Sequence, residues 1–255
     1  MKHEDFGLIS IIMAAYNAEK TIEQAISSVL SQTYSNFELI IVNDCSKDGT
    51  VQLVENIAAK DSRVHLISNE KNSGVSFTRK HGLEEAKGEW IAILDSDDVW
   101  APEKLEKQID LQEKTNADLL FTGSAFMDAD GNPINWYLVA PAEVNYRQLL
   151  KQNVLSNSSA LVRKELYAKY YAVGDGMHED FAIWLSILKE GRKAYGVDEP
   201  LLIYRIAKSS KSGNKVKAAM MNWNTYRYVG LNPVFALYYE CWYIVKGLLK
   251  YKNLK

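Results

Sequence analysis

Residues 91–98 read Ile-Ala-Ile-Leu-Asp-Ser-Asp-Asp, an apolar run that ends in three carboxylates within four positions. The run has the length and composition of a buried strand, so the acids are expected at its carboxyl end. In open α/β sheets that edge is where ligands bind. Three like charges this close repel one another, and Mg²⁺ or Mn²⁺, which prefer hard oxygen ligands, would offset the repulsion. The alternative is a solvated turn with an acidic helix start, because Asp is favoured near helix N-termini.

The segments around this run alternate between strand and helix patterns. Further strands are expected at residues 8–15, 37–42 and 64–68, and helices begin near residues 18, 50 and 75. Asn17 is expected to cap the helix at residues 18–30. Strands that alternate with helices predict an α/β fold with a parallel, doubly wound sheet.

Composition and charge are typical of an intracellular globular protein that does not bind nucleic acid. The chain has 255 residues and a formal net charge of −2, which gives no indication of nucleic-acid binding. Cys45 and Cys241 have no metal-ligand spacing, and we expect free thiols in a reducing compartment. The first residues lack the apolar core of a signal peptide, and no apolar run reaches the ~18 residues of a membrane span. A cytoplasmic location is therefore expected.

Polar groups follow each of the first four strands, and in a parallel sheet they all lie at one edge. A nucleotide base can stack on Tyr16 and donate a ring N–H to Asp44. Arg79 can bring positive charge to a phosphate or steady the carboxylates, while a metal on Asp97 can bridge a diphosphate. Each has a structural alternative: Tyr16 closes a corner, Asp44 caps a turn, and Arg79 is a surface residue. Together they predict a nucleotide-diphosphate site without a Walker-type loop.

Four segments resemble the motifs of family-two glycosyltransferases, which have the GT-A fold. They are the opening strand at residues 9–17, the acidic turn at 42–50, the Asn-Ser-Gly of 72–74 followed by Arg79, and the Asp-x-Asp of 94–98. Their order and spacing match over residues 8 to 110. Asn43 replaces the usual first Asp of the turn, and Lys80 replaces a common Asn after the arginine.

The resemblance implies a Rossmann-like GT-A fold, with a mostly parallel sheet, helices on both faces and a helical C-terminal appendage. It also implies an inverting enzyme of bacterial surface polysaccharide or lipopolysaccharide synthesis, with a nucleotide-sugar donor. An aspartate at Asp44 that accepts a ring N–H suits uridine or thymidine better than guanosine, so we expect a UDP-sugar. Mn²⁺ or Mg²⁺ is the implied cofactor, and the acceptor is a glycan hydroxyl, often carried on a lipid in this family. The metal ligands are then Asp97 and Asp95, and the donor-binding residues are Ala15, Tyr16, Asn17, Asp44, Arg79, Asp95, Ser96, Arg205, Lys208 and Lys215.

Residues 178–184, His-Glu-Asp-Phe-Ala-Ile-Trp, resemble the Glu-Asp motif of the same family. The resemblance implies that Asp180 is the catalytic base that takes a proton from the acceptor, with Glu179 as the alternative. The helix dipole lowers the pKa of a carboxylate in this position, whereas burial or neighbouring acids raise it. An ordinary acidic first turn is the structural alternative.

We expect a catalytic domain at residues 1–206, with a nucleotide-sugar half at 1–116 and an acceptor half at 117–206. Residues 207–255 are expected to form a flexible loop and C-terminal helices. Arg205, Lys208 and Lys215 flank this loop, which either closes over the diphosphate as a lid or is a solvated linker. The aromatic, lysine-tipped stretch at residues 233–252 either lies in the interface on the inner face of the membrane or packs on the protein's own core.

Two other classes of function fit parts of the sequence. The Asp-x-Asp-x-Val of residues 95–99 also fits a haloacid-dehalogenase-type phosphatase, although that motif usually follows the first strand. A non-catalytic module that binds sugar nucleotides or glycans is the second alternative.

Overall fold

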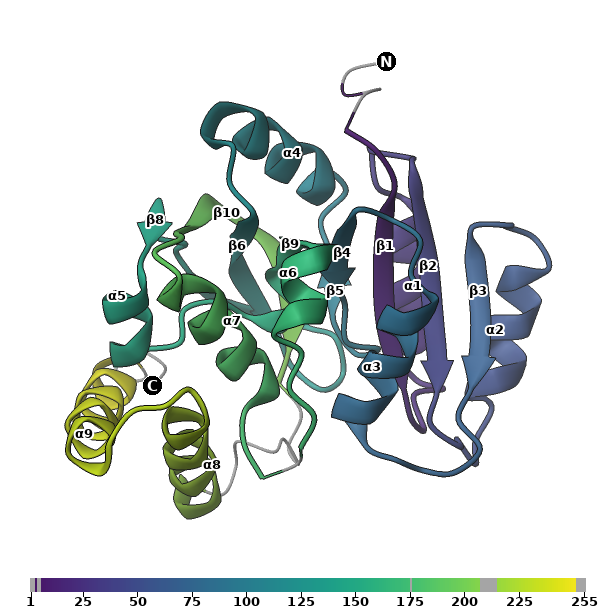
Figure 1. Ribbon diagram of the computed structural model, residues 1–255. Helices are drawn as coiled ribbons and strands as arrows, with labels where there is room; N and C mark the ends of the chain where they lie inside the picture. Colours follow the sequence, from purple (N-terminus) through teal and green to yellow (C-terminus); the bar gives the residue numbers. More distant parts are fainter. Residues whose placement is uncertain (1–2, 4–5, 175, 207–214, 251–255) are drawn as a thin grey trace.

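The computed structural model describes residue 3 and residues 6–174, 176–206 and 215–250. The first apolar segments form β1 (Ile9–Ala15), β2 (Phe37–Asn43), β3 (Val64–Ser68) and β4 (Trp90–Ile93). These strands are parallel and lie in the order β3-β2-β1-β4. The expected doubly wound parallel arrangement is therefore confirmed for the first half of the chain, and polar loops follow the strands at one edge (Figure 1).

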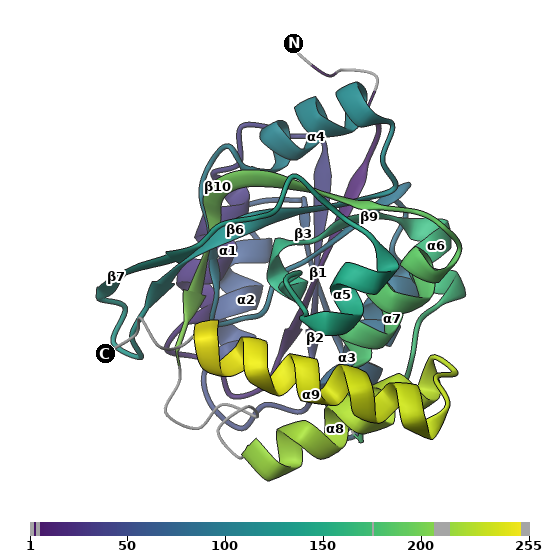
Figure 2. The same cartoon turned by 90° about the vertical axis from the view of Figure 1, so that its left-hand side faces the viewer.

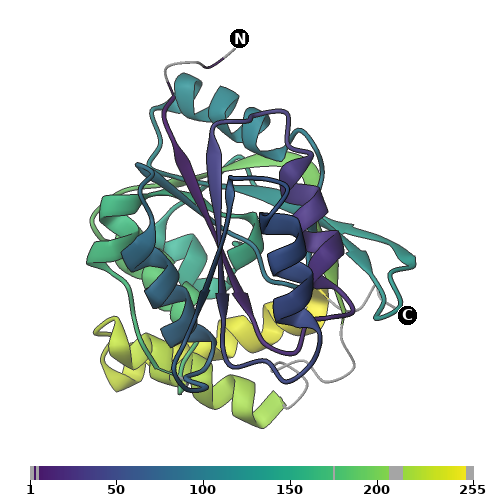
Figure 3. The same cartoon turned by 90° about the vertical axis from the view of Figure 1, so that its right-hand side faces the viewer.

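Successive strand residues point to opposite faces of the sheet, and both sets are mostly apolar, so helices cover both faces of these strands. α1 (Ile22–Leu30) and α2 (Thr50–Ala58) cover one face, and α3 (Val75–Glu85) covers the other (Figure 3). The core is correspondingly divided in two: Ile11 and Ile26 belong to one cluster, and Ile12 and Leu83 to the other.

The expected cap of the first helix is wrong. α1 begins at Ile22 with Thr21 in the cap position, and Asn17 has a left-handed backbone with φ 49°. The Asn17 Oδ1 atom instead accepts a hydrogen bond from the Lys47 backbone N–H at 2.8 Å. The Ala18 N–H donates to Thr50 Oγ1 at 2.8 Å. Asn17 thus joins the loops after β1 and β2, because the two parallel strands end side by side.

The second half extends the same sheet. β9 (Leu161–Arg163) is antiparallel to β4 and to β6 (Leu119–Met127), and β6 pairs in parallel with β10 (Ala194–Arg205). Short strands β5 (Val99–Trp100) and β8 (Glu143–Val144) pair with β10, and β7 (Pro133–Leu138) pairs with β6. The remaining elements before the last two helices are α4 (Lys104–Thr115), α5 (Tyr146–Lys151), the short 3₁₀ helix η1 (Asn157–Ser159), α6 (Lys164–Lys169) and α7 (Glu179–Lys189).

The chain ends in two helices, α8 (Lys215–Tyr228) and α9 (Pro233–Lys250), which pack against α5 and α7 (Figure 2). They form the expected helical appendage. None of the helices within the described ranges is both long and apolar enough to cross a membrane. The proposed boundary at residue 206 stays a prediction.

Candidate active site

Asp44 lies at the end of β2 and is 4% exposed. Its carboxylate accepts hydrogen bonds from Asn69 Nδ2 at 2.8 Å and from the backbone N–H groups of Ser73 and Gly74 at 2.8 and 2.9 Å. Burial alone raises the pKa of Asp44, but these hydrogen bonds outweigh it and hold the pKa below its usual value. Asp44 is therefore a fixed anion that also positions the loop after β3, and its oxygens retain capacity for a further donor.

The residues after β1 differ in what they offer a ligand. Tyr16 is 52% exposed, so its ring is open to a base. Ala15 is buried, and its backbone oxygen accepts from the Asp44 N–H at 2.8 Å. Asn17 is engaged with the neighbouring loop, as described above. Tyr16 and Asn17 are thus both accessible in this segment, and the hydrogen bonds of Ala15 and Asn17 fix its position.

Arg79 on α3 connects the two halves of the chain. Its guanidinium is buried and donates from Nη2 to Asp95 after β4, and from Nη1 to Glu179 at the start of α7. Burial opposes the charge, but Asp95 and Glu179 hold the pKa of Arg79 well above its usual value. Arg79 therefore holds two carboxylates in place, and its contact with a donor phosphate stays a prediction.

The three carboxylates of the acidic loop after β4, residues 95–98, have different surroundings. Asp95 and Asp97 are part-exposed, whereas Asp98 is 1% exposed and its Oδ1 accepts from the Arg205 N–H at 3.0 Å. Burial, and then the charge of Asp95, raise the pKa of Asp97. Burial and both neighbouring acids raise the pKa of Asp98 well above its usual range. The loop therefore concentrates negative charge at a partly open position.

The donor set of this loop fits a hard divalent cation. Within the described ranges, no cationic side chain forms an ion pair with Asp97, while Asp95 is shared with Arg79. Among the described residues, a separate group of side chains that could ligate a metal lies at α4 and consists of His3, Asp110 and Glu113. At the acidic loop one or two carboxylates are available, and Mg²⁺ and Mn²⁺ are commonly bound by that number together with substrate phosphates.

Arg205, at the end of β10, is hydrogen-bonded to the acidic loop. Its Nε donates to the Asp97 backbone oxygen at 2.9 Å, and its Nη2 donates to Gln24 Oε1 at 2.6 Å. The guanidinium is thus engaged with protein, and a contact with diphosphate stays a prediction. Lys208 lies outside the described residues. Lys215 is the first residue of α8, and its side chain also lies outside them.

The two candidate bases have different surroundings. Glu179 forms an ion pair with Arg79. Asp180 is partly exposed to solvent, and its partial burial, followed by the negative charge of Glu179, raises its pKa to about 7. A general base is most effective when its pKa is near the working pH. The surroundings therefore favour Asp180 over Glu179 as the base.

Ser158 in η1 also contacts this region, and no sequence motif marks it. Its Oγ accepts from the Asp95 N–H at 3.2 Å, and its backbone oxygen accepts from Trp100 Nε1 at 2.7 Å. Lys104 lies over the Trp100 ring at 3.9 Å and donates to Gln108 Oε1 at 2.9 Å. The acidic loop is therefore hydrogen-bonded to a buried polar network that includes Ser158 from the second half of the chain. No local sequence pattern predicts this network.

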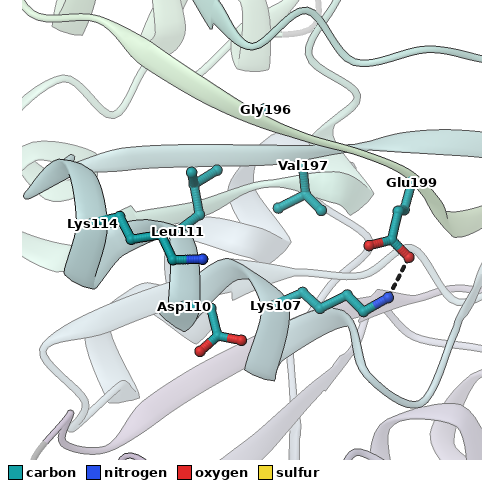
Figure 4. Close-up of a pocket in the computed structure, with 7 residues that line it drawn as sticks. All are labelled: Lys107, Asp110, Leu111, Lys114, Gly196, Val197 and Glu199. Atoms are coloured by element: carbon teal, nitrogen blue, oxygen red, sulfur yellow. Dashed lines mark hydrogen bonds and ion pairs between the residues drawn. The ribbon is translucent and has the colours of Figure 1, made fainter.

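An open groove of about 310 Å³ lies between α4 and β10 (Figure 4). Lys107 and Glu199 form an ion pair in it. Figure 1 places α4 at the edge of the sheet opposite to the loops that follow β1 and β2. This groove is therefore separate from the convergent site residues.

Comparison with solved structures gives the same fold. Staphylococcus aureus TarS, in a structure of residues 1–349 with UDP-GlcNAc, matches with a TM-score of 0.73 and 20% identity over 94% of this chain and 72% of that one. The mannosyltransferase PcManGT from Pyrobaculum calidifontis, solved with GDP-Man and Mn²⁺, matches with a TM-score of 0.68 and 17% identity over 92% and 69% of the two chains.

Sequence comparison identifies the family. Residues 10–171 match the model described as "Glycosyl transferase family 2". WfgD of Escherichia coli, named as a UDP-Glc:alpha-D-GlcNAc-diphosphoundecaprenol beta-1,3-glucosyltransferase, is 37% identical over 98% of this chain and 99% of its own. The phosphatase alternative has no support, because its motif is expected after a first strand and here follows β4. The chain belongs to glycosyl transferase family 2 and is a glycosyltransferase.

Proposed function

We propose that this glycosyltransferase moves a sugar from a UDP-sugar to a hydroxyl of a lipid-linked glycan, with inversion at the anomeric carbon and with Asp180 as the base. The observation that carries the proposal is the Arg79 guanidinium, which contacts Asp95 of the acidic loop and Glu179 beside the candidate base. One buried cation thus holds the donor side and the acceptor side of the site together. The names of the relatives support the substrate classes, since WfgD is named for UDP-Glc and a diphosphoundecaprenol acceptor.

The donor's base lies against Tyr16 in this proposal, and its ring N–H donates to Asp44. An ionised carboxylate suits that contact because it is an acceptor only, and uracil offers an N–H donor. The hydrogen bonds to Asp44 keep it ionised and fixed, which limits the entropy lost when the base binds.

The diphosphate lies towards the acidic loop. Asp97 and Asp95 would hold a divalent cation there, which supplies charge neutralisation to the departing diphosphate. Arg205 and Ser158 hold this loop through its backbone, at Asp97 O and Asp95 N. They keep the carboxylates in place while the charge on the leaving group grows.

Asp180 removes the proton from the acceptor hydroxyl as that oxygen attacks the anomeric carbon opposite to the leaving group. The C–O bond to the diphosphate breaks in the same displacement, and the proton ends on the Asp180 carboxylate. A pKa near 7 lets this group be ionised at neutral pH and still accept a proton effectively. Arg79 balances the charges of Asp95 and Glu179 around it.

A transfer assay tests this proposal. The purified full chain is incubated with UDP-glucose, UDP-GlcNAc or GDP-mannose, each with and without Mn²⁺, and with a GlcNAc-diphospholipid acceptor. We expect cation-dependent release of UDP and a longer glycolipid with one UDP-sugar. Transfer from GDP-mannose in preference would overturn the uridine assignment, and donor binding without transfer to any acceptor would overturn the catalytic one.

A further inference from the structure

The solvent-facing half of α9 is apolar, the reverse of an ordinary surface helix. Seven large apolar side chains between residues 234 and 245 are 39% to 76% exposed: Val234, Phe235, Leu237, Tyr238, Trp242, Ile244 and Val245. Cys241 is also exposed. With 3.6 residues per turn, these positions fill an arc of about 180°. We call this set of eight residues the α9 apolar face.

The charged residues of this helix segment lie on its inner half. Residues 233–247 contain two charged side chains, Glu240 and Lys246, and neither is on the α9 apolar face. Glu240 is 8% exposed and accepts from Asn222 Nδ2 of α8 at 2.7 Å. The inner half also packs aromatic rings on the core, with Tyr243 6.0 Å from the Phe181 ring of α7. The inner side of the helix is therefore packed and hydrogen-bonded. Its apolar outer side stays exposed among the described residues, although Lys151 Nζ lies 5.3 Å from the Trp242 ring.

We propose that the α9 apolar face docks on the surface of an anionic lipid bilayer. Contiguous exposed apolar patches of this kind mark membrane or protein contact sites. Trp242 and Tyr238 are the residue types that favour the headgroup level, because their rings are apolar and carry one polar atom. Residues 250–255, which follow this face in the sequence, add three lysines and no acid, which complements anionic headgroups.

A second copy of the chain fits this face less well. It would bring the same three lysines into the assembly, and the α9 apolar face has no acidic residue with which to pair them. Unpaired like charges at an interface oppose association. A bilayer with anionic lipids supplies both the apolar phase and the counter-charge.

The α9 apolar face is connected to the candidate base through α8, which packs on α9. The Thr225 hydroxyl of α8 accepts from the His178 N–H at 3.0 Å, two residues before Asp180. Asn224 donates to the Gly176 oxygen at 2.8 Å. Figure 1 shows α8 and α9 at the end of the molecule where β1 and β2 finish, which is the end that carries the donor loops. Docking would thus bring the site to the level of the headgroups, where the diphosphate of a lipid-linked acceptor lies; this step rests on the proposed function.

Vesicle flotation of the full chain tests the docking surface independently of transfer. At low salt we expect flotation with phosphatidylglycerol-containing vesicles and little with pure phosphatidylcholine. A double variant, Leu237→Glu with Ile244→Glu, should lower the bound fraction at least tenfold. The matched control, Tyr137→Glu with Val139→Glu, changes two equally exposed apolar residues near β7 and should bind as the wild type does. Circular dichroism verifies that both variants are folded.

Three results would overturn the proposal: a wild type that ignores anionic vesicles, a folded double variant that binds them undiminished, or a wild-type dimer that the double variant dissociates. Turnover on a short, water-soluble acceptor separates this proposal from the proposed function. The double variant should retain that turnover and lose it on acceptor embedded in vesicles. If the wild type floats but transfers no sugar, the proposed function fails and the docking surface stands.

Discussion

Exchange of Glu179 for Gln should make Asp180 a stronger acid and move the pH dependence of the reaction. Burial, then the charge of Glu179, raise the pKa of Asp180 to about 7, from an ordinary value of 3.8. Arg79 and Asp95 act on the same group in opposite directions, the first lowering and the second raising its pKa. Because a general base works only when ionised, kcat/KM for the acceptor should fall about tenfold per pH unit below 7 in the wild type.

The size of the shift follows from Coulomb's law. Two carboxylates on adjacent residues of a helix start lie ~6–8 Å apart, and at an effective dielectric constant of ~20 their repulsion is about 2–3 kcal/mol. That energy equals about 1.5 to 2 pKa units. Glu179→Gln removes it and also leaves Arg79 with one carboxylate partner fewer, which acts in the same direction. The acidic limb should therefore move down by about 1.5 to 2 pH units.

The assay is the initial rate of UDP release against pH at saturating donor, with Asp180→Asn measured beside Glu179→Gln. The Asp180 variant should lose about 10²–10⁴ in turnover, bind donor normally and show no acidic limb from this group. The reasoning is refuted if Glu179→Gln suffers the large loss while Asp180→Asn keeps both turnover and the limb near 7. That result would assign the base to Glu179.

Three further predictions concern the donor side. Asp97→Asn should abolish Mn²⁺-dependent binding of UDP in calorimetry, whereas Asp98→Asn should retain it. The pKa of Asp98 lies well above its usual range, and an amide oxygen at this position can still accept from the Arg205 N–H. Equal losses of binding in the two variants would contradict this difference between Asp97 and Asp98. Asp98→Ala should instead lower the thermal midpoint through the lost hydrogen bond, and an unchanged midpoint would show that this bond adds no stability. Asp44→Ala should weaken UDP more than pyrophosphate with Mn²⁺, and equal weakening would mean that Asp44 only shapes its loop.

Local patterns were sufficient for the first half of the fold. The apolar run at residues 37–42 predicted β2, which is buried along its whole length as central parallel strands are. The run at residues 64–68 predicted β3, an edge strand in which only Val64 is buried. Chain order then placed the loops at one edge, and Arg79 does contact Asp95 there. What the sequence left open was which partner Arg79 takes, since a salt bridge across 100 residues to Glu179 has no local signature.

The arrangement of the second half of the chain could not be predicted from local sequence patterns, because it depends on long-range contacts. β9 has three residues, and its antiparallel place between β4 and β6 depends on long-range pairing and not on a repeat in its own sequence. The family resemblance implied a contact of Arg205 with the diphosphate, which stays a prediction, while the bond from its Nε to a backbone oxygen 108 residues away had no local signature. For α9 the sequence allowed either a packed or an exposed helix. The structure shows packing on one half and exposed apolar side chains on the other, a division that hydropathy alone does not specify.

The stereochemistry of the product tests the central claim most directly. The purified chain, UDP-glucose or UDP-GlcNAc, Mn²⁺ and a GlcNAc-diphospholipid acceptor are incubated, and the anomeric configuration of the new bond is read from its proton coupling by NMR. A single displacement with Asp180 as base predicts that an α-linked donor gives a β-linked product, and that Asp180→Asn gives almost none. An α-linked product from the wild type would contradict the account.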